Sequence, residues 1–188
     1  MYHIMKANVY LTVLSVIILS CTGLADKKMS TSQENSTGYF MGGAEANFTM
    51  GDQESVKVFL DFIDKHNQKD FEGLRKLISD SISISGPRGE FIKGGDAHIA
   101  FLKDWFATGD LNWKPVWGTS VKFPGSGDAN SVIGVLDLNI KTKDTLMMVN
   151  QLIVAVIKKS KVDAFWVHER QFTAIELESI MASAQLVQ

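Results

Sequence analysis

The sequence predicts an α+β domain in which helices come first and long strands follow. Apolar residues recur at helical spacing after residue 52, strict alternation begins at residue 81, and four strand patterns separated by turns fill residues 112–173. The composition supports a folded core, because 45% of the 188 residues are hydrophobic and 21% are charged. We therefore expect one folded domain preceded by extra segments.

Three helices are expected in the first half of this domain. Asp52 is placed to cap the first helix, and Asp70 is placed to cap a shorter second helix. The apolar face of the first helix is made of Val56, Phe59, Leu60 and Ile63. The third helix is expected to start at Gly94 and to end at Gly109. Its apolar face is made of Ile99, Leu102 and Phe106.

A hairpin is expected between the second and third helices. Residues 81–85 alternate Ser with Ile, as a half-buried strand does, and residues 86–89 (GPRG) form a turn before a short return strand. Four longer strands follow the third helix, and we expect Trp113 and Trp117 to share one face of the first of them. A short helix is expected at residues 174–184.

The N-terminus has the pattern of a secretory signal. Lys6 precedes an apolar run at residues 9–19, which is short for a membrane span, although an uncleaved anchor is the alternative. The run ends in residues 18–21 (ILSC), which resemble a bacterial lipobox. The resemblance implies lipidation of Cys21 and an outer-membrane lipoprotein facing the periplasm, with the membrane as a partner through its lipid. A chance thiol is the alternative interpretation of Cys21.

Four segments follow from these patterns. We expect a lipoprotein signal peptide at residues 1–20, then Cys21 and a flexible tether up to residue 51, because this stretch is rich in Ser, Thr, Gly and Asn. The folded domain is expected at residues 52–176, and a C-terminal tail or short helix at residues 177–188.

Charge and cysteine content argue against several function classes. The chain has 19 Lys and Arg against 21 Asp and Glu, so no basic excess favours a nucleic-acid partner. The single Cys excludes an internal disulfide, and the four His residues show no paired metal-ligand spacing. We therefore expect no metal, no other cofactor and no nucleic acid.

The order of elements and two short motifs resemble the nuclear transport factor 2 family, especially its SnoaL-like branch. The motifs are residues 70–74 (DFEGL), at the entry to the second helix, and residues 94–99 (GGDAHI), at the third. The resemblance covers roughly residues 54–173. It implies a cystatin-like cone, in which a curved antiparallel sheet wraps three N-terminal helices around a cavity. Many members dimerise through the sheet, so the resemblance also implies a homodimer.

The resemblance includes enzymes such as ketosteroid isomerase and polyketide cyclases, together with non-catalytic binding proteins. The isomerase has a catalytic Asp just before the Pro of the hairpin turn, where this chain has Gly86, and an oxyanion Tyr in the first helix, where it has Phe62. Glycine cannot abstract a proton and phenylalanine cannot donate to an oxyanion. The isomerase mechanism is therefore not expected here.

The predicted ligand site depends on alternation in the last strand. Trp166, His168 and Arg170 lie two residues apart and so share a face, which is apolar at its ends and polar in the middle. We expect this face to line the cavity, with His168 near Trp105 or Trp117, and these five residues to bind a small, largely apolar ligand. The alternatives are a cross-strand or dimer-surface position for His168 and Arg170, and simple core packing for the tryptophans.

A small-molecule enzyme of the cyclase, isomerase or dehydratase kind is the alternative to a binding protein. Its catalytic residues would be His168 and Asp137, although Asp137 could equally lie on the solvent side of its strand. His66 and His98 are interpreted as exposed helix residues. A further alternative is a cone filled by its own side chains that acts only as a dimerising module.

Overall fold

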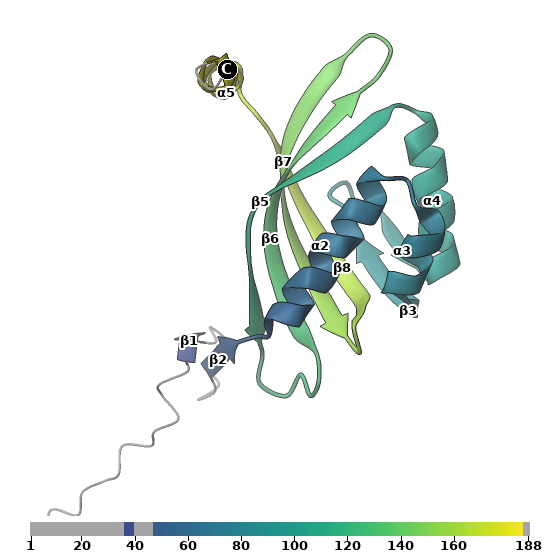
Figure 1. Ribbon diagram of the computed structural model, residues 1–188, viewed down its shortest axis with the longest axis vertical. Coiled ribbons are helices and arrows are strands. Elements are labelled where there is room, and N and C mark those ends of the chain that lie inside the picture. The colour runs from purple at the N-terminus through teal and green to yellow at the C-terminus, as the bar shows by residue number, and fades with distance from the viewer. Residues whose placement is uncertain (1–35, 40–46, 186–188) are drawn as a thin grey trace, which may run out of the picture. The chain divides into compact units, whose positions relative to one another are not determined.

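The computed structural model describes residues 36–39 and 47–185 (Figure 1). The helices are α2 (Gln53–Asn67), α3 (Phe71–Leu77), α4 (Gly95–Ala107) and α5 (Ala174–Gln185). The strands are β1 (Ser36–Tyr39), β2 (Asn47–Met50), β3 (Ile78–Ser85), β4 (Phe91–Lys93), β5 (Asp110–Lys122), β6 (Asn130–Lys141), β7 (Leu146–Lys158) and β8 (Lys161–Gln171). The α+β class and the order of helices and strands after residue 52 are as predicted.

The described strands form one sheet in the order β1-β2-β5-β6-β7-β8-β3-β4. The pairings are antiparallel except that β3 runs parallel to β8. The sheet is therefore mixed, where a wholly antiparallel one was expected. The long strands β5 to β8 curve, and helices α2, α3 and α4 lie on the same side of them (Figure 1). This arrangement gives the sheet an inner face, toward the helices, and an outer face.

Both predicted helix caps are confirmed. The Asp52 carboxylate accepts a hydrogen bond of 2.7 Å from the backbone N–H of Ser55, at the start of α2. Asp70 accepts one of 2.8 Å from the N–H of Gly73, at the start of α3. Such caps satisfy backbone N–H groups that have no partner within the helix. The hydrogen bonds from Ser55 lower the pKa of Asp52. The pKa of Asp70 is lowered first by its hydrogen bond with Lys65 and then by the cap bond from Gly73.

The core lies between α2 and the inner face of the sheet. The predicted apolar face of α2 is confirmed at Phe59 and Ile63, which are buried, but Leu60 is 43% exposed. The buried side of the helix is centred instead on Phe62, which is 2% exposed. Helical periodicity allowed either face, and the curvature of the sheet decides which one is covered.

The expected tether overlaps ordered structure. Strands β1 and β2 pair with each other, and β2 also pairs with the end of β5. Two strands therefore lie within the segment that was expected to be a flexible tether. The predicted signal sequence and Cys21 lie outside the described residues. Among the residues that the structure describes, no helix is long and apolar enough to cross a membrane.

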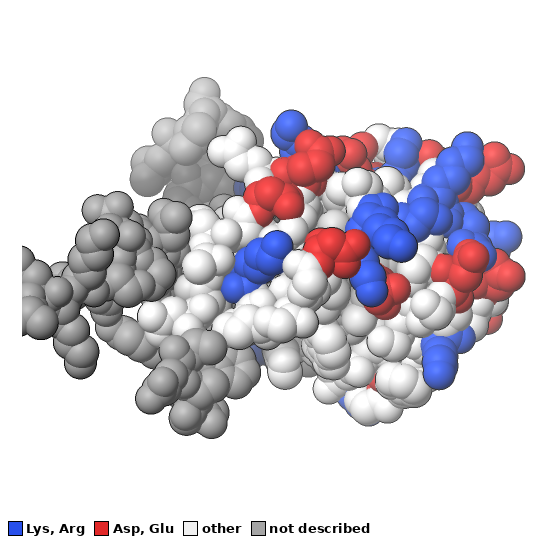
Figure 2. Space-filling model, turned by 90° about the horizontal axis from the view of Figure 1, so that it is seen from below, with Lys and Arg blue, Asp and Glu red and all other residues white. Residues whose placement is uncertain are grey.

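Charged side chains of both signs share the surface. On the face drawn in Figure 2, acidic and basic residues are interspersed, without a large area of one sign. Several form ion pairs, such as Arg75, whose guanidinium lies 2.6 Å from Asp80 and 2.8 Å from Asp96. These two contacts join the end of α3 to β3 and to the start of α4. Exposed pairs of this kind contribute little stability each, so burial remains the main stabilising term.

Candidate ligand-binding site

A cavity of about 540 Å³ lies between α2, α4 and the inner face of the sheet. Its walls are mainly apolar, and they include five aromatic side chains: Phe62, Phe101, Trp105, Trp113 and Phe165. Its polar lining is made of His66, Arg88, Glu90, His98, Asp104, Thr108, Gln151 and Glu169. A concave, mostly apolar space with a few polar groups is the usual form of a small-molecule site.

His66 is a neutral imidazole at the cavity wall. It is 5% exposed, and its Nδ1 lies 2.7 Å from the carbonyl oxygen of Phe62, one turn earlier in α2. Because a carbonyl can only accept, Nδ1 carries the hydrogen and Nε2 carries the lone pair. Burial lowers the pKa of His66 to about 4, against a smaller opposing effect of the hydrogen bond to Phe62.

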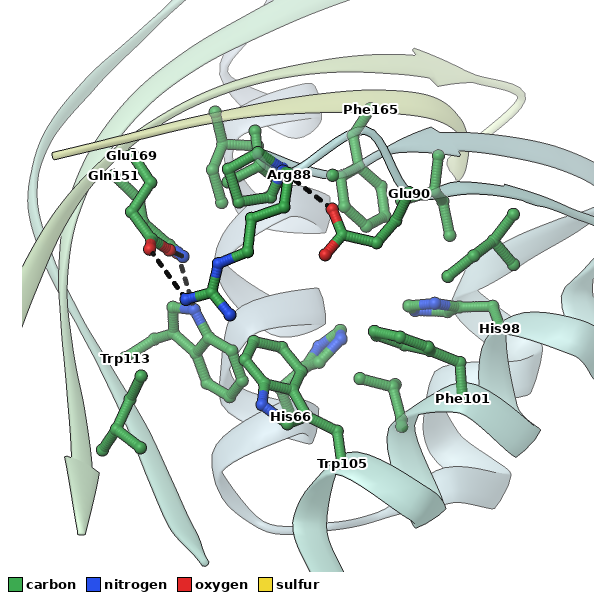
Figure 3. Close-up of a pocket in the computed structure, with 18 of the residues that line it drawn as sticks. His66, Arg88, Glu90, His98, Phe101, Trp105, Trp113, Gln151, Phe165 and Glu169 are labelled. Carbon is green, nitrogen blue, oxygen red and sulfur yellow. Dashed lines mark hydrogen bonds and ion pairs between the residues drawn. The ribbon is translucent and has the colours of Figure 1, made fainter. Parts of the chain in front are cut away.

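The second cavity histidine is His98, on α4. The centre of its ring lies 5.6 Å from the centre of the His66 ring. The side chain points into the cavity beside Phe101 (Figure 3). It is 2% exposed, and neither ring nitrogen has a hydrogen-bond partner among the described residues. Burial, and secondarily His66, lower the pKa of His98 to about 3, so that this imidazole is also neutral at pH 7.

A chain of hydrogen bonds holds a carboxylate on the opposite wall. The indole Nε1 of Trp113 donates to Oε1 of Gln151 over 2.9 Å, and Nε2 of Gln151 donates to Oε2 of Glu169 over 3.0 Å. Arg88 approaches the same carboxylate, with 3.6 Å between its Nη2 and Oε1 of Glu169 (Figure 3). Each of these hydrogen bonds fixes the side chain that follows it. The carboxylate of Glu169 therefore faces the cavity, with its side chain 13% exposed.

The hairpin turn between β3 and β4 places Arg88 at the cavity. The N–H of Gly86 donates to the carbonyl of Glu90 over 2.9 Å and closes the turn. The Glu90 carboxylate accepts from the N–H of Arg88 over 2.8 Å. Gly89 has a φ of +91°, a backbone conformation that glycine adopts readily and other residues rarely. The turn thus holds its own arginine over the cavity (Figure 3).

Three positions singled out from the sequence do line the cavity. Trp105 is one of its aromatic walls. Gly86 and Phe62, the positions where the sequence resemblance places the base and the tyrosine of the isomerase, line it as well. The structure therefore brings these two positions to the cavity without the functional groups that the isomerase chemistry needs. A ligand-binding role for Trp105 remains a prediction.

The expected placement of Trp166, His168 and Arg170 is wrong, because all three lie on the outer face of the sheet. His168 pairs with Leu152, which is 38% exposed, and Trp166 is itself 42% exposed. Arg170 forms an ion pair of 2.9 Å with Glu176 of α5. The outer position corresponds to the alternative of a cross-strand or surface role. The homodimer remains a prediction.

A β-bulge in β8 accounts for this reversal. Ala164 pairs with Val156, but Val162 pairs with the next residue of β7, so Asp163 has no partner across the ladder. One extra residue shifts the alternation by one, so Val162 and Phe165 are both buried. Beyond the bulge, the odd-numbered residues face the cavity, where the uninterrupted alternation predicted the even-numbered ones.

A second bulge separates the two tryptophans of β5. Pro115 and Trp117 pair with consecutive residues of β6, and Val116 is therefore extra. Trp113, before the bulge, lines the cavity, whereas Trp117, after it, is 56% exposed on the outer face. The expectation that Trp113 and Trp117 share a face, and that Trp117 lines the cavity, is wrong for this reason.

Asp137 also lies on the outer face, as the solvent-side alternative expected. Its neighbours Leu136 and Leu138 are fully buried on the inner face. The carboxylate accepts a hydrogen bond of 2.8 Å from the side-chain amide of Asn150, its partner on β7. Asp137 and His168 are therefore not placed to act on a molecule in the cavity.

The sequence interpretation missed both cavity histidines, which it expected to be exposed. A signal for His66 exists, because Phe59, Phe62, Ile63 and His66 fall at i, i+3, i+4 and i+7. His98 lies four residues before Leu102 and is buried with it. Treating histidine as compatible with an apolar helix face would have found both. No local signal indicates Glu169 or Gln151, because their orientation depends on strand pairing.

Comparison with known proteins identifies the fold by structure alone. No family model and no curated protein sequence matches the chain. A candidate ketosteroid isomerase from Kribbella flavida DSM 17836 is similar, with 13% identity and a TM-score of 0.54 over 66% of this chain and 83% of that chain. An LEH-like epoxide hydrolase from M. tuberculosis has 12% identity and a TM-score of 0.51 over 62% and 83%, respectively. A candidate polyketide cyclase from Xanthomonas campestris pv. campestris has 8% identity and a TM-score of 0.51 over 66% and 94%.

The domain has the nuclear transport factor 2-like fold. At these identities the likeness establishes the fold and leaves the activity to the residues of the cavity. The expected architecture, a curved sheet with helices on one side, is confirmed. In this NTF2-like domain the cavity lies on the side of the sheet that the helices cover.

Proposed function

We propose that the NTF2-like domain binds a small, largely apolar molecule in its cavity. The observation that carries this proposal is the cavity itself, with about 540 Å³ of space and five aromatic side chains among its walls. Among its polar groups, Gln151 and Glu169 are held in position by hydrogen bonds, as orientation of a ligand requires. A cone filled by its own side chains would leave no such space.

Binding without catalysis is the favoured form of this proposal. Gly86 and Phe62 supply neither a base nor an oxyanion donor. With pKa values of about 4 and 3, His66 and His98 are weak bases compared with an imidazole tuned near neutral pH. Both rings suit hydrogen bonding to a ligand better than proton abstraction at pH 7.

An enzyme of small apolar substrates is the second candidate, and Glu169 is the observation that favours it. Its carboxylate is held by Gln151 and approached by Arg88 within the cavity, an arrangement that could take a proton from a substrate or from water. Structures with this fold include a candidate ketosteroid isomerase, an epoxide hydrolase and a candidate polyketide cyclase. Turnover of such a substrate that is lost in Glu169→Gln would support this candidate.

The protein is proposed to act at the bacterial envelope, anchored by lipid on Cys21. The support is the apolar run that ends in the lipobox-like residues 18–21. A small apolar ligand is scarce in water and concentrated at a membrane, so a binding domain held at that surface meets its ligand more often.

A neutral fluorescent probe tests the binding proposal. Nile red is expected to bind the domain, and Val167→Phe, which fills the cavity, should weaken binding at least about tenfold. Val154→Phe is the matched control, because Val154 lies on the outer face and pairs with Trp166. Equal affinity in both variants would contradict the proposal. Native mass spectrometry of the purified domain would show any ligand that remains bound.

A further inference from the structure

His98 has hydrogen-bonding capacity that the described residues do not use. A neutral imidazole carries one N–H donor and one lone-pair acceptor, and both of its nitrogens are buried without a partner. Leaving buried polar atoms unpaired costs free energy, so in folded proteins such atoms usually pair with a protein group, an ordered water or a bound molecule. Because the ring lines the cavity, a bound molecule can supply the missing partner.

The side chains around His98 cannot supply that partner themselves. The rings of Phe62 and Phe165 lie with their centres 6.1 and 5.7 Å away, and neither carries a polar atom. Nδ1 of His66 is already committed to the carbonyl of Phe62, and the described structure has no hydrogen bond between Nε2 of His66 and the ring of His98. A partner for His98 can therefore enter from the cavity.

The charges of the cavity limit what can enter. Glu90, Asp104 and Glu169 line it, against the single guanidinium of Arg88, which is already paired with Glu169. Since both cavity histidines are neutral at pH 7, the lining carries more negative than positive charge. A carboxylate ligand would meet like charges and would find no free cation among the lining residues that the structure describes.

We propose that the ligand is a neutral molecule with a flat apolar body and a hydroxyl group that hydrogen-bonds to His98. A hydroxyl can both donate and accept, so it satisfies either nitrogen in either tautomer. The flat body packs against the aromatic walls, among them Phe101, Trp105 and Trp113. This inference rests on the proposed function, because it assumes that the cavity binds a ligand.

Three probes of similar size test separately the preference for a hydroxyl group and the exclusion of a carboxylate. The probes are pyrene, 1-hydroxypyrene and 1-pyrenecarboxylate, and their affinities for the intact protein are measured by fluorescence titration at pH 7. The hydroxyl compound is expected to bind about tenfold more tightly than pyrene, and the carboxylate more weakly than either. A carboxylate that binds as tightly as the hydroxyl compound would overturn the inference.

Two phenylalanine variants assign the preference to one histidine. His98→Phe removes both nitrogens at similar volume and should reduce the hydroxyl preference to within about twofold while pyrene itself still binds. His168→Phe is the matched control, because His168 lies on the outer face, and it should leave the preference unchanged. A preference that survives in His98→Phe would overturn the proposal.

A measurement on the unmodified protein avoids dependence on the folding of the variant. Imidazole nitrogen signals of His98, followed by NMR, should shift when 1-hydroxypyrene is added and should move little with pyrene. Unchanged signals at saturation would overturn the role of His98. If none of the three probes binds and Nile red also fails, the proposed function itself is wrong. If they bind without a hydroxyl preference, only the present inference fails.

Discussion

Two buried imidazoles distinguish this chain at the level of single residues. His66 and His98 sit among Phe62, Trp113 and Phe165, at ring-centre distances between 4.3 and 6.1 Å. Such surroundings exclude water and disfavour the charged form of each ring. Holding both rings neutral makes the folded state sensitive to acid.

Folding stability should therefore fall as the pH drops from 6.5 to 5. The pKa values of about 4 and 3 in the folded state lie below the ordinary value of 6.5, so in this range the unfolded chain binds more protons than the folded chain. The contribution of the two neutral rings to folding stability is present above pH 6.5, and it is lost as the pH falls toward the folded-state pKa values. At pH 5 the loss is on the order of 2 kcal/mol for each ring. Urea unfolding at several pH values measures it.

Two variants assign the acid sensitivity to the cavity. His98→Phe should remove about half of the pH dependence between pH 6.5 and 5, whereas His168→Phe, on the outer face, should leave it unchanged. The carboxyl groups with lowered pKa, such as Asp52 and Asp70, have ordinary values of 3.8 and contribute mainly at lower pH. An unchanged slope in His98→Phe would contradict a neutral, buried His98.

At the level of elements, the contact of α2 with β6 depends on a glycine. A Cβ placed on Gly134 would lie 2.7 Å from the ring of Phe59, which is 3% exposed and cannot turn away easily. Strand β6 can therefore approach α2 closely only because this position lacks a side chain.

Gly134→Ala should destabilise the domain by about 1–3 kcal/mol, since the added methyl overpacks this contact. Chemical denaturation of the variant measures the effect. In a Phe59→Leu background the clash is relieved, and the added cost of the alanine should fall below about half of its value in the parent protein. Additive costs in the double variant would show that Gly134 has some other role.

The bulge at Asp163 is the element that decides which side of β8 faces the cavity. Deleting this residue should restore uninterrupted alternation, so that Phe165 leaves the core or the strand loses its pairing. The expected loss is about 3–5 kcal/mol, the range for removing a buried phenylalanine, together with loss of Nile red binding. Asp163→Ala keeps the residue count and should change stability by less than about 1 kcal/mol. Thermal unfolding compares the two.

At the level of the whole molecule, the proposed membrane location depends on Cys21, which lies outside the residues that the structure describes. If Cys21 is lipidated, radiolabelled fatty acid should be incorporated into the wild-type protein in a bacterial host, and Cys21→Ser should abolish the label. The folded domain should be unaffected, so the variant should bind Nile red as the wild type does. Equal label in both proteins would exclude the lipobox.

The sequence by itself determined the class of the fold and the order of its elements. Asp52 and Asp70 were identified as caps, and residues 81–85 as a strand, because these signals are local: a cap acts within four residues and strand alternation within a few. Element type is decided over such short distances. The inner face of β6, with Leu136 and Leu138, could be predicted for the same reason, since no bulge interrupts the pairing of β6 with β7.

Only the tertiary structure decided the site. A single unpaired residue in β8 and another in β5 reverse the side chains that follow, and moved His168 and Trp117 away from the cavity. A bulge is a mismatch in the pairing of two strands, so the sequence of one strand alone does not predict its position. His66 and His98 come from helices about thirty residues apart, and only the curved sheet brings them within 5.6 Å and removes them from water. The chemistry of this cavity arises from that long-range packing.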